Sequence, residues 1–165
     1  MIDELKPHSE LIAKYSSEFN LDPVLVGAII MQESRAKVWT ARYEPNSKYK
    51  INVAEFAKLT GISQDTELCF QKTSWGLMHV MGVKARELGF VSFLPQLLLP
   101  SLAIEYGCRA LLGFKIRYQS AEDVIASYNA GSPRRLASGL YVNQDYVDGV
   151  KRWISKQLST SQSNP

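Results

Sequence analysis

The sequence has 165 residues, a length that suits one domain with a single hydrophobic core. Hydrophobic residues make up 45% of it and charged residues 21%, which is ordinary for a soluble globular protein. The net charge of +3 is too small to indicate nucleic-acid binding, although it would not hinder binding to an anionic polymer. The longest apolar run, residues 23–31, is too short to span a membrane, so we expect no membrane insertion.

The N-terminal sequence MIDELKPHSE has neither the basic nor the apolar region of a secretory signal, so we expect a protein made in the cytoplasm. Cys69 and Cys108 both have apolar neighbours, which favours two buried thiols over a disulfide. His8 and His79 lie far apart, and the sequence has neither an HExxH motif nor a CxxC pair. We therefore expect no metal and no cofactor.

Apolar residues recur at helical spacing along most of the chain and no segment shows convincing strand alternation, so we predict an all-α fold. The predicted domain covers residues 1–158, and the polar tail at residues 159–165 is expected to be disordered. The least regular region, between the second and third helices, is predicted to be an ordered loop. In chain order, the predicted helices cover residues 9–18, 23 through Glu33, 52–61, 78–88, 100–118, 120–131 and 143–158.

Capping patterns support several of these boundaries. Asp22 is followed by a proline, a combination typical of a helix start. Asn52 and Glu55 have the spacing of a capping box, and Ser120 is a further N-terminal cap. Gly131 closes the helix that Ser120 begins, as glycine often does.

Glu33 is the first candidate for catalysis. Leu25, Ile29 and Glu33 are spaced four residues apart, so the carboxylate continues the apolar face of its helix. It also falls in the last turn, where the helix dipole disfavours a negative charge. Burial and dipole would both favour the protonated acid, as a general acid needs. The alternative is that the helix ends one turn earlier and leaves Glu33 in solvent.

The segment SYNAGS, residues 127–132, is a second polar cluster at the end of an apolar helix. Tyr128 follows Val124 by four residues and Ile125 by three, so its ring should face inward with a hydroxyl that needs a partner. A buried carboxylic acid would supply that partner. Alternatively, Asn129 and Gly131 merely form the C-terminal cap of the helix.

Four segments together resemble the soluble lytic transglycosylase family, which has a helical fold similar to goose-type lysozyme. The family pattern is a Glu-Ser at a helix end, a Gly-Leu-Met-Gln block, a Tyr-Asn-Ala-Gly block and a closing Tyr-Val. The matching segments occur in that order between about residues 8 and 155, and they are QES at 32–34, SWGLMHVMG at 74–82, SYNAGS at 127–132 and YVDGV at 146–150.

The resemblance implies that Glu33 is the single catalytic acid/base, supported by Ser34 and hydrogen-bonded by Tyr128. It also implies a set of substrate-binding or supporting residues, namely Ser74, Gly76, Leu77, Met78, His79, Asn129 and Tyr146. The glycines of segment 74–82 are interpreted as positions where the backbone approaches a sugar chain, so that this segment forms one wall of a glycan cleft with Glu33 opposite.

Two departures from the family pattern stand out. The family glutamine is His79 here, which could still donate or accept a hydrogen bond with substrate or could instead be a partly buried structural residue. The chain between Ser34 and Ser74 is also longer, with an insertion at about residues 37–72. Within it, ARYEP at 41–45 resembles muramidases of phage origin.

The implied activity is cleavage of the β-1,4 bond between N-acetylmuramic acid and N-acetylglucosamine in peptidoglycan, with formation of 1,6-anhydromuramic acid ends. One alternative is an inverting muramidase, which needs a second carboxylate roughly 6.5–9.5 Å from the first. Glu44 and Glu105 are its candidates, unless Glu44 pairs with Arg42 and Glu105 is simply solvated. The other alternative is a non-catalytic glycan-binding module.

The expected partner is the glycan strand of peptidoglycan, bound by a monomer. The missing leader and the ARYEP segment suggest a phage endolysin or a virion-borne enzyme that acts on the periplasmic or cell-wall peptidoglycan.

Overall fold

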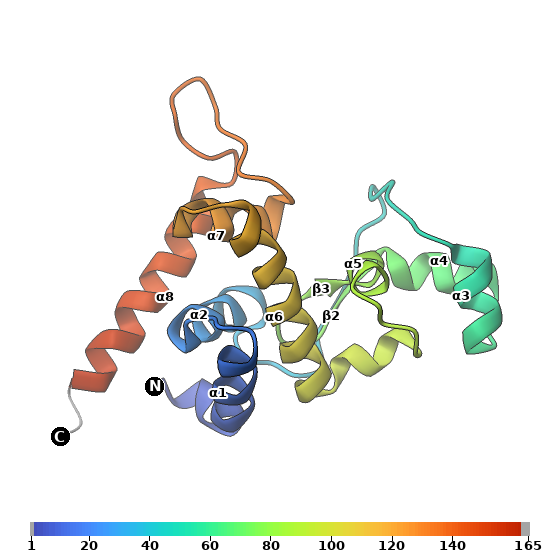
Figure 1. The fold of residues 1–165 in the computed structure, drawn as a ribbon, viewed down its shortest axis with the longest axis horizontal. Helices are drawn as coiled ribbons and strands as arrows, with labels where there is room; N and C mark the ends of the chain where they lie inside the picture. Colours follow the sequence, from blue (N-terminus) through green and yellow to red (C-terminus); the bar gives the residue numbers. More distant parts are fainter. Residues whose placement is uncertain (1, 163–165) are drawn as a thin grey trace. The chain divides into compact units, whose positions relative to one another are not determined.

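The computed structural model describes residues 2–162 and is mostly helical, as predicted (Figure 1). Its contacts divide the chain into two units. One comprises the chain up to Ala36 together with the chain from Cys108 onward, and the other is Lys37–Gly107. The second unit is larger than the insertion expected at about residues 37–72, because it also contains segment 74–82 and the first half of a long helix.

Among the described residues of the first unit, the regular elements are all helices. They are η1 (Asp3–His8), α1 (Ser9–Glu18), α2 (Pro23–Ser34), the end of α6 (Pro100–Arg117), α7 (Ala121–Ala130) and α8 (Gln144–Gln162). α8 continues four residues beyond the predicted helix end, so residues 159–162 are helical, and residues 163–165 of the expected tail lie outside the described part. The loop between α7 and α8 extends away from both helices (Figure 1).

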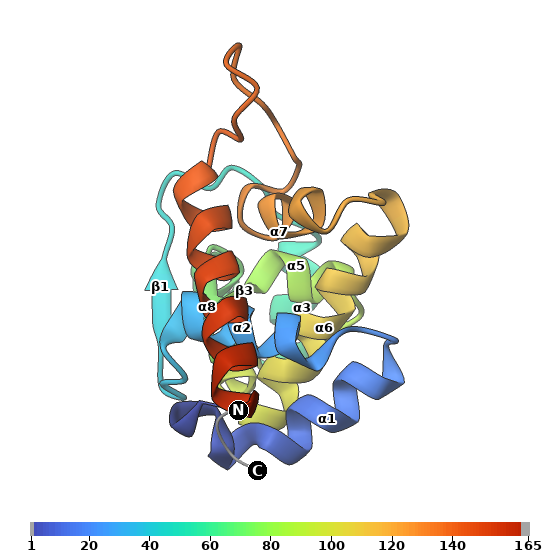
Figure 2. The ribbon, with the colours of Figure 1, turned by 90° about the vertical axis from the view of Figure 1, so that its left-hand side faces the viewer.

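α2 forms the centre of this unit. Its residues from Val26 to Met31 are all buried, which is the pattern of a helix covered on every side. It packs chiefly against α8, which crosses it in Figure 2, and also against α1. Two glycines allow the close approach of α2 and α8. A Cβ on Gly27 would lie 2.7 Å from Oε1 of Gln157, and one on Gly149 would overlap the side-chain amide of Gln32.

The second unit combines short helices with a small antiparallel sheet of order β1-β2-β3, which the sequence analysis did not predict. Arg42 of β1 lies opposite Ser74 of β2, and Ser74 lies opposite Met81 of β3. The elements are β1 (Ala41–Tyr43), α3 (Val53–Thr60), α4 (Gln64–Gln71), β2 (Thr73–Trp75), β3 (Val80–Met81), α5 (Gly82–Glu87), η2 (Leu94–Leu98) and the start of α6.

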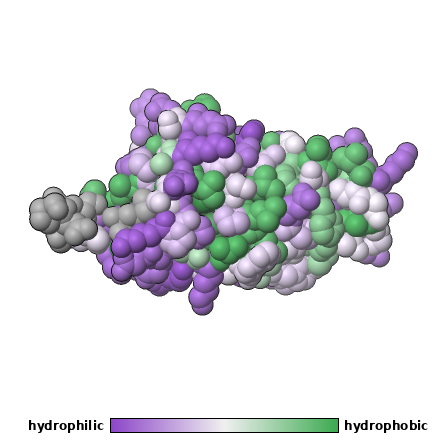
Figure 3. Space-filling view, turned by 90° about the horizontal axis from the view of Figure 1, so that it is seen from below, coloured by the Kyte–Doolittle hydropathy of each residue, from purple (hydrophilic) through white to green (hydrophobic). Residues whose placement is uncertain are grey.

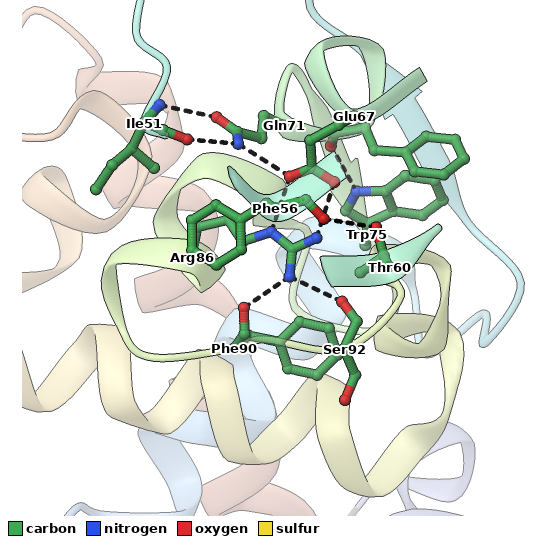
Figure 4. Close-up of polar contacts among 10 residues, drawn as sticks. Ile51, Phe56, Thr60, Glu67, Gln71, Trp75, Arg86, Phe90 and Ser92 are labelled. Carbon is green, nitrogen blue, oxygen red and sulfur yellow. Dashed lines mark hydrogen bonds and ion pairs between the residues drawn. The ribbon is translucent and has the colours of Figure 1, made fainter. Parts of the chain in front are cut away.

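A buried ion pair holds α4 and α5 of the second unit together (Figure 4). Arg86 donates from Nε and Nη2 to the two oxygens of Glu67, each at 2.8 Å, and both side chains are fully buried. Nη1 of Arg86 donates to the carbonyl oxygens of Phe90 and Ser92. Gln71 donates to Glu67 and forms two hydrogen bonds with the backbone of Ile51. The network therefore fixes the chain before α3 on α4.

On the face drawn in Figure 3, hydrophobic side chains lie among hydrophilic ones, as is usual for a protein surface. Within residues 2–162, no helix has both the length and the apolar character of a membrane span.

Candidate active site

The end of α2 positions Glu33. The Asp22 side chain accepts a hydrogen bond from the Val24 amide at 2.8 Å and caps the helix at its start, as predicted. The helix continues through Ser34, so Glu33 lies in its last turn and the alternative of an earlier helix end is wrong. Arg35 and Ala36 then adopt left-handed conformations with φ of 55° and 59°, which turn the chain sharply.

The Glu33 carboxylate is half-buried and meets α8 of the same unit. Its Oε1 accepts a hydrogen bond of 2.6 Å from the hydroxyl of Tyr146, which lies in the first turn of α8. The family resemblance implied for Tyr146 only a substrate-binding or supporting role. The structure gives it a direct polar contact with the predicted catalytic carboxylate.

Tyr128 of α7 belongs to the same cluster. Burial raises the pKa of its hydroxyl well above the ordinary value, and the nearby Glu33 charge raises it further. Burial likewise raises the pKa of Tyr146, and the charge of Glu33 and the hydrogen bond to it add to that effect. Both phenols therefore stay neutral across the physiological range and keep their protons as donors.

The close packing of α2 and α8 determines how Glu33 and Tyr146 meet. Gln32, next to Glu33, lies against Gly149, one turn after Tyr146. Farther along the helices, Nε2 of Gln157 donates to the Val24 carbonyl oxygen at 2.9 Å. Sequence reasoning missed Gly149, although a glycine inside a helix three residues after a site tyrosine is a signal for such an approach.

The remaining predicted residues of the first unit lie in α2 and α7. Ser34 is buried and donates to the Ile30 carbonyl oxygen at 3.2 Å. Asn129 is exposed and accepts a hydrogen bond of 3.1 Å from Asn143, which also donates to the Ala126 carbonyl oxygen. Sequence reasoning did not identify Asn143, which connects the end of α7 to the start of α8.

Segment 74–82 lies in the second unit, where it forms most of a β-hairpin and ends at Gly82, the first residue of α5. Ser74 is buried and its hydroxyl lies 3.1 Å from the sulfur of Met81. Leu77 and Met78 in the turn are fully buried, so their side chains belong to the core of this unit. His79 is half-buried with a left-handed φ of 45°, and its amide donates to the Gly76 carbonyl oxygen.

Protein atoms account for the two glycines in this segment, so the glycines do not by themselves indicate an approach of sugar. Gly76 has a φ of 67°, and a Cβ there would overlap the Leu97 carbonyl oxygen. A Cβ on Gly82 would overlap the Phe70 carbonyl oxygen. Both residues are glycine because the fold brings other backbone against them.

The two candidates for a second carboxylate also belong to the second unit. Glu44 forms an ion pair of 2.5 Å with Arg42, which is the alternative to a catalytic role given above. Glu105 is half-buried in α6 rather than fully solvated. Both cysteines are free, but Cys69 is exposed on α4, so the expectation of two buried thiols holds only for Cys108. Among the described residues, no three side chains of the metal-ligating types are grouped as a metal site would require.

A half-buried carboxylate that accepts a hydrogen bond from a neutral phenol is suited to proton transfer, and here it lies at a helix end of a mostly helical protein. Residues 10–144 match the model of the transglycosylase SLT domain family. The chain belongs to this family, whose activity is of the peptidoglycan lytic transglycosylase type. No curated protein and no solved structure matches the chain.

Proposed function

We propose that this protein is a lytic transglycosylase that cleaves the β-1,4 bond between N-acetylmuramic acid and N-acetylglucosamine with Glu33 as its only acid/base. The observation that carries the proposal is the 2.6 Å hydrogen bond from Tyr146 to Glu33 in the last turn of α2. A bond of this kind orients a carboxylate and leaves it able to exchange a proton with a bound sugar.

The reaction begins with protonated Glu33. With Oε1 accepting the Tyr146 hydroxyl, Oε2 carries the proton that passes to the glycosidic oxygen as the bond from that oxygen to muramic C1 breaks. The acetamido group of the muramic residue stabilises the positive charge that develops at C1. The C6 hydroxyl oxygen then bonds to C1 and its proton returns to Glu33, so the acid is restored and no water is consumed.

The two neutral tyrosines keep their protons throughout the reaction, and Tyr146 stabilises the ionised form of Glu33. Because their pKa values are raised, neither loses its proton to Glu33 when the carboxylate is ionised between the steps. Tyr146 therefore remains a donor to the anionic form, which it stabilises more than the neutral form. General acid–base assistance of this kind contributes about 10²–10⁴ in rate.

An inverting muramidase would need a second carboxylate to activate water. Glu44 is a weak candidate because it is already paired with Arg42. Product analysis distinguishes the two reactions. Purified peptidoglycan is digested with the wild type, with Glu33→Gln and with Glu10→Gln, which alters an exposed glutamate of α1 as a matched control.

We expect anhydromuramic ends in the mass spectra of the wild-type and Glu10→Gln digests, and no products from Glu33→Gln. Reducing ends alone would refute the transglycosylase in favour of the hydrolase. Lysis by Glu33→Gln at the wild-type rate would refute the catalytic role of Glu33, and binding without cleavage by the wild type would leave a glycan-binding module.

We also propose that the enzyme is of phage origin and acts on the host cell wall as an endolysin or virion component, on the strength of the ARYEP segment at residues 41–45. Cytoplasmic expression with and without a holin tests this. Lysis that requires the holin is expected, and lysis that is independent of it would contradict the endolysin proposal.

A further inference from the structure

The second unit contains a pocket that the proposed catalytic residues do not use. It has a volume of about 620 Å³ and lies between the chain after β1 and the last turn of α4. Three of its lining residues are lysines, Lys48, Lys50 and Lys72, and Asn46, Ser47 and Leu68 also contribute. No acidic residue lines it. We call it the lysine pocket.

The walls of the lysine pocket are held by hydrogen bonds at both ends. At one end the Glu44 amide donates to the Lys72 carbonyl oxygen at 2.9 Å, and Nζ of Lys72 donates to the Pro45 carbonyl oxygen at 3.3 Å. At the other end the Ile51 amide donates to Gln71, which the buried pair of Figure 4 holds in place. The pocket is thus framed by ordered chain.

Two acidic side chains near the pocket, those of Glu44 and Glu67, are paired with arginines that do not line it. Glu67, on the same helix as Leu68, is fully buried against Arg86. Glu44 is paired with Arg42. In the part of the chain that the structure describes, none of the three lysines has a carboxylate partner within ion-pair distance. The pocket therefore carries a net positive charge and favours an anion.

Aromatic side chains flank the same stretch of chain. Trp39, Tyr43 and Tyr49 are all more than half exposed, an unusual concentration of large rings on a surface. The hydroxyl of Tyr49, between two of the lysines in sequence, is hydrogen-bonded to Glu87, which raises the pKa of Tyr49. A pocket lined by lysines suits a polymer that carries carboxylates.

We propose that the lysine pocket binds a carboxylate of the peptide stems of peptidoglycan and so adds a second point of attachment to the substrate. The inference rests on the proposed function for the identity of the polymer. In intact peptidoglycan the lactyl carboxyl group of muramic acid is consumed in an amide bond, so the free carboxylates are those of the stems. Binding of one stem would retain the strand on the enzyme between cleavage events.

The test measures binding separately from cleavage. All variants are made in the Glu33→Gln background, and their affinity is measured for sacculi from which phosphate polymers have been removed. The pocket variant is Lys48→Gln/Lys50→Gln/Lys72→Gln. Its control has the same change in net charge at three exposed sites outside the pocket, Lys58→Gln/Arg117→Gln/Arg152→Gln.

We expect the pocket variant to bind sacculi about tenfold more weakly than the parent at low salt, and the control variant to change far less. The difference should shrink at high salt because Lys48 and Lys50 are exposed. Amidation of the stem carboxylates should weaken the binding of the parent to sacculi by a similar factor and leave the binding of the pocket variant unchanged.

An equal loss in the control variant, or an undiminished effect of the pocket variant on amidated sacculi, would overturn the proposal. A loss seen only on sacculi that retain their phosphate polymers would overturn it in favour of a phosphate ligand. Cleavage by the wild type is assayed independently. A wild type that fails to cleave while the binding results hold would refute the proposed function and leave the pocket's preference for carboxylates intact.

Discussion

Replacing Arg86 by methionine should cost about 3–5 kcal/mol of unfolding free energy, because the change leaves the buried Glu67 without its counter-ion. The contacts of Arg86 account for the size of the expected loss. Arg86 makes two hydrogen bonds to Glu67 and one to each of two carbonyl groups, those of Phe90 and Ser92, and none of its side chain is exposed. A protein of ordinary stability, about 5–15 kcal/mol, would lose roughly a fifth or more of it.

Urea unfolding followed by circular dichroism measures this loss as a midpoint lower by about 1 M or more. The control is Lys84→Met, which removes a partly exposed ion pair with Glu87 and should cost less than about 1 kcal/mol. The double variant Glu67→Met/Arg86→Met should be more stable than Arg86→Met alone, since it removes both buried charges. Equal stability of Arg86→Met and Lys84→Met would refute the reasoning.

Three further predictions concern single sites. Tyr146→Phe should lower the free energy of unfolding by about 1.5–3 kcal/mol and also lower kcat. Because the pKa of Tyr146 is raised in the folded state, the wild type should lose its extra stability over this variant as pH rises above about 10. Urea unfolding of both proteins at several pH values checks this. In the native protein a thiol reagent should label Cys69 and spare Cys108, because burial raises the pKa of Cys108 to about 12. Peptide mapping measures the labelling, and equal labelling of both cysteines would contradict the structure. Gly76→Ala should cost about 2–5 kcal/mol, because strain and overlap combine, whereas Gly61→Ala, with a similar φ but open space, should cost about 1–2 kcal/mol in the same unfolding assay.

Local signals in the sequence were sufficient to predict most helices of the first unit. Asp22 and Ser120 cap α2 and α7 through side-chain hydrogen bonds, and Gly131 ends α7 in a left-handed conformation. These boundaries depend on interactions within a few residues, so the sequence contains them. Asn52 is an exception, because it adopts a left-handed φ of 42° and its side chain forms no cap for α3.

The hairpin of β2 and β3 could not be predicted in this way. Its strands have three and two residues, too few for alternation to be recognised, and their apolar residues fit a helix equally well. The helix expected at residues 78–88 therefore begins only at Gly82 and ends at Glu87. What makes Gly76 and Gly82 glycines is contact with Leu97 and Phe70, which no local pattern encodes.

The candidate site could be predicted only in part, because some of its contacts join residues that are far apart in the sequence. The position of Glu33 on its helix follows from spacing of four residues, and the structure confirms the last-turn location. The hydrogen bond expected from Tyr128 remains a prediction, and a hydrogen bond to Glu33 also comes from Tyr146, more than a hundred residues away in the chain. That pairing depends on how α8 crosses α2, which depends in turn on Gly149.

The two left-handed residues that follow α2 bear on attempts to make this protein more heat-resistant. Arg35 and Ala36 hold a backbone conformation that costs about 1–3 kcal/mol each in residues other than glycine. Glycine at position 36 would relieve that strain, but it would also loosen the bend directly after Glu33. The guanidinium of Arg35, 4.7 Å from the ring centroid of Trp153, anchors the same bend. A substitution that raises thermal stability at this bend would thus disturb the orientation of the Glu33 carboxylate, and stabilising changes are better placed elsewhere.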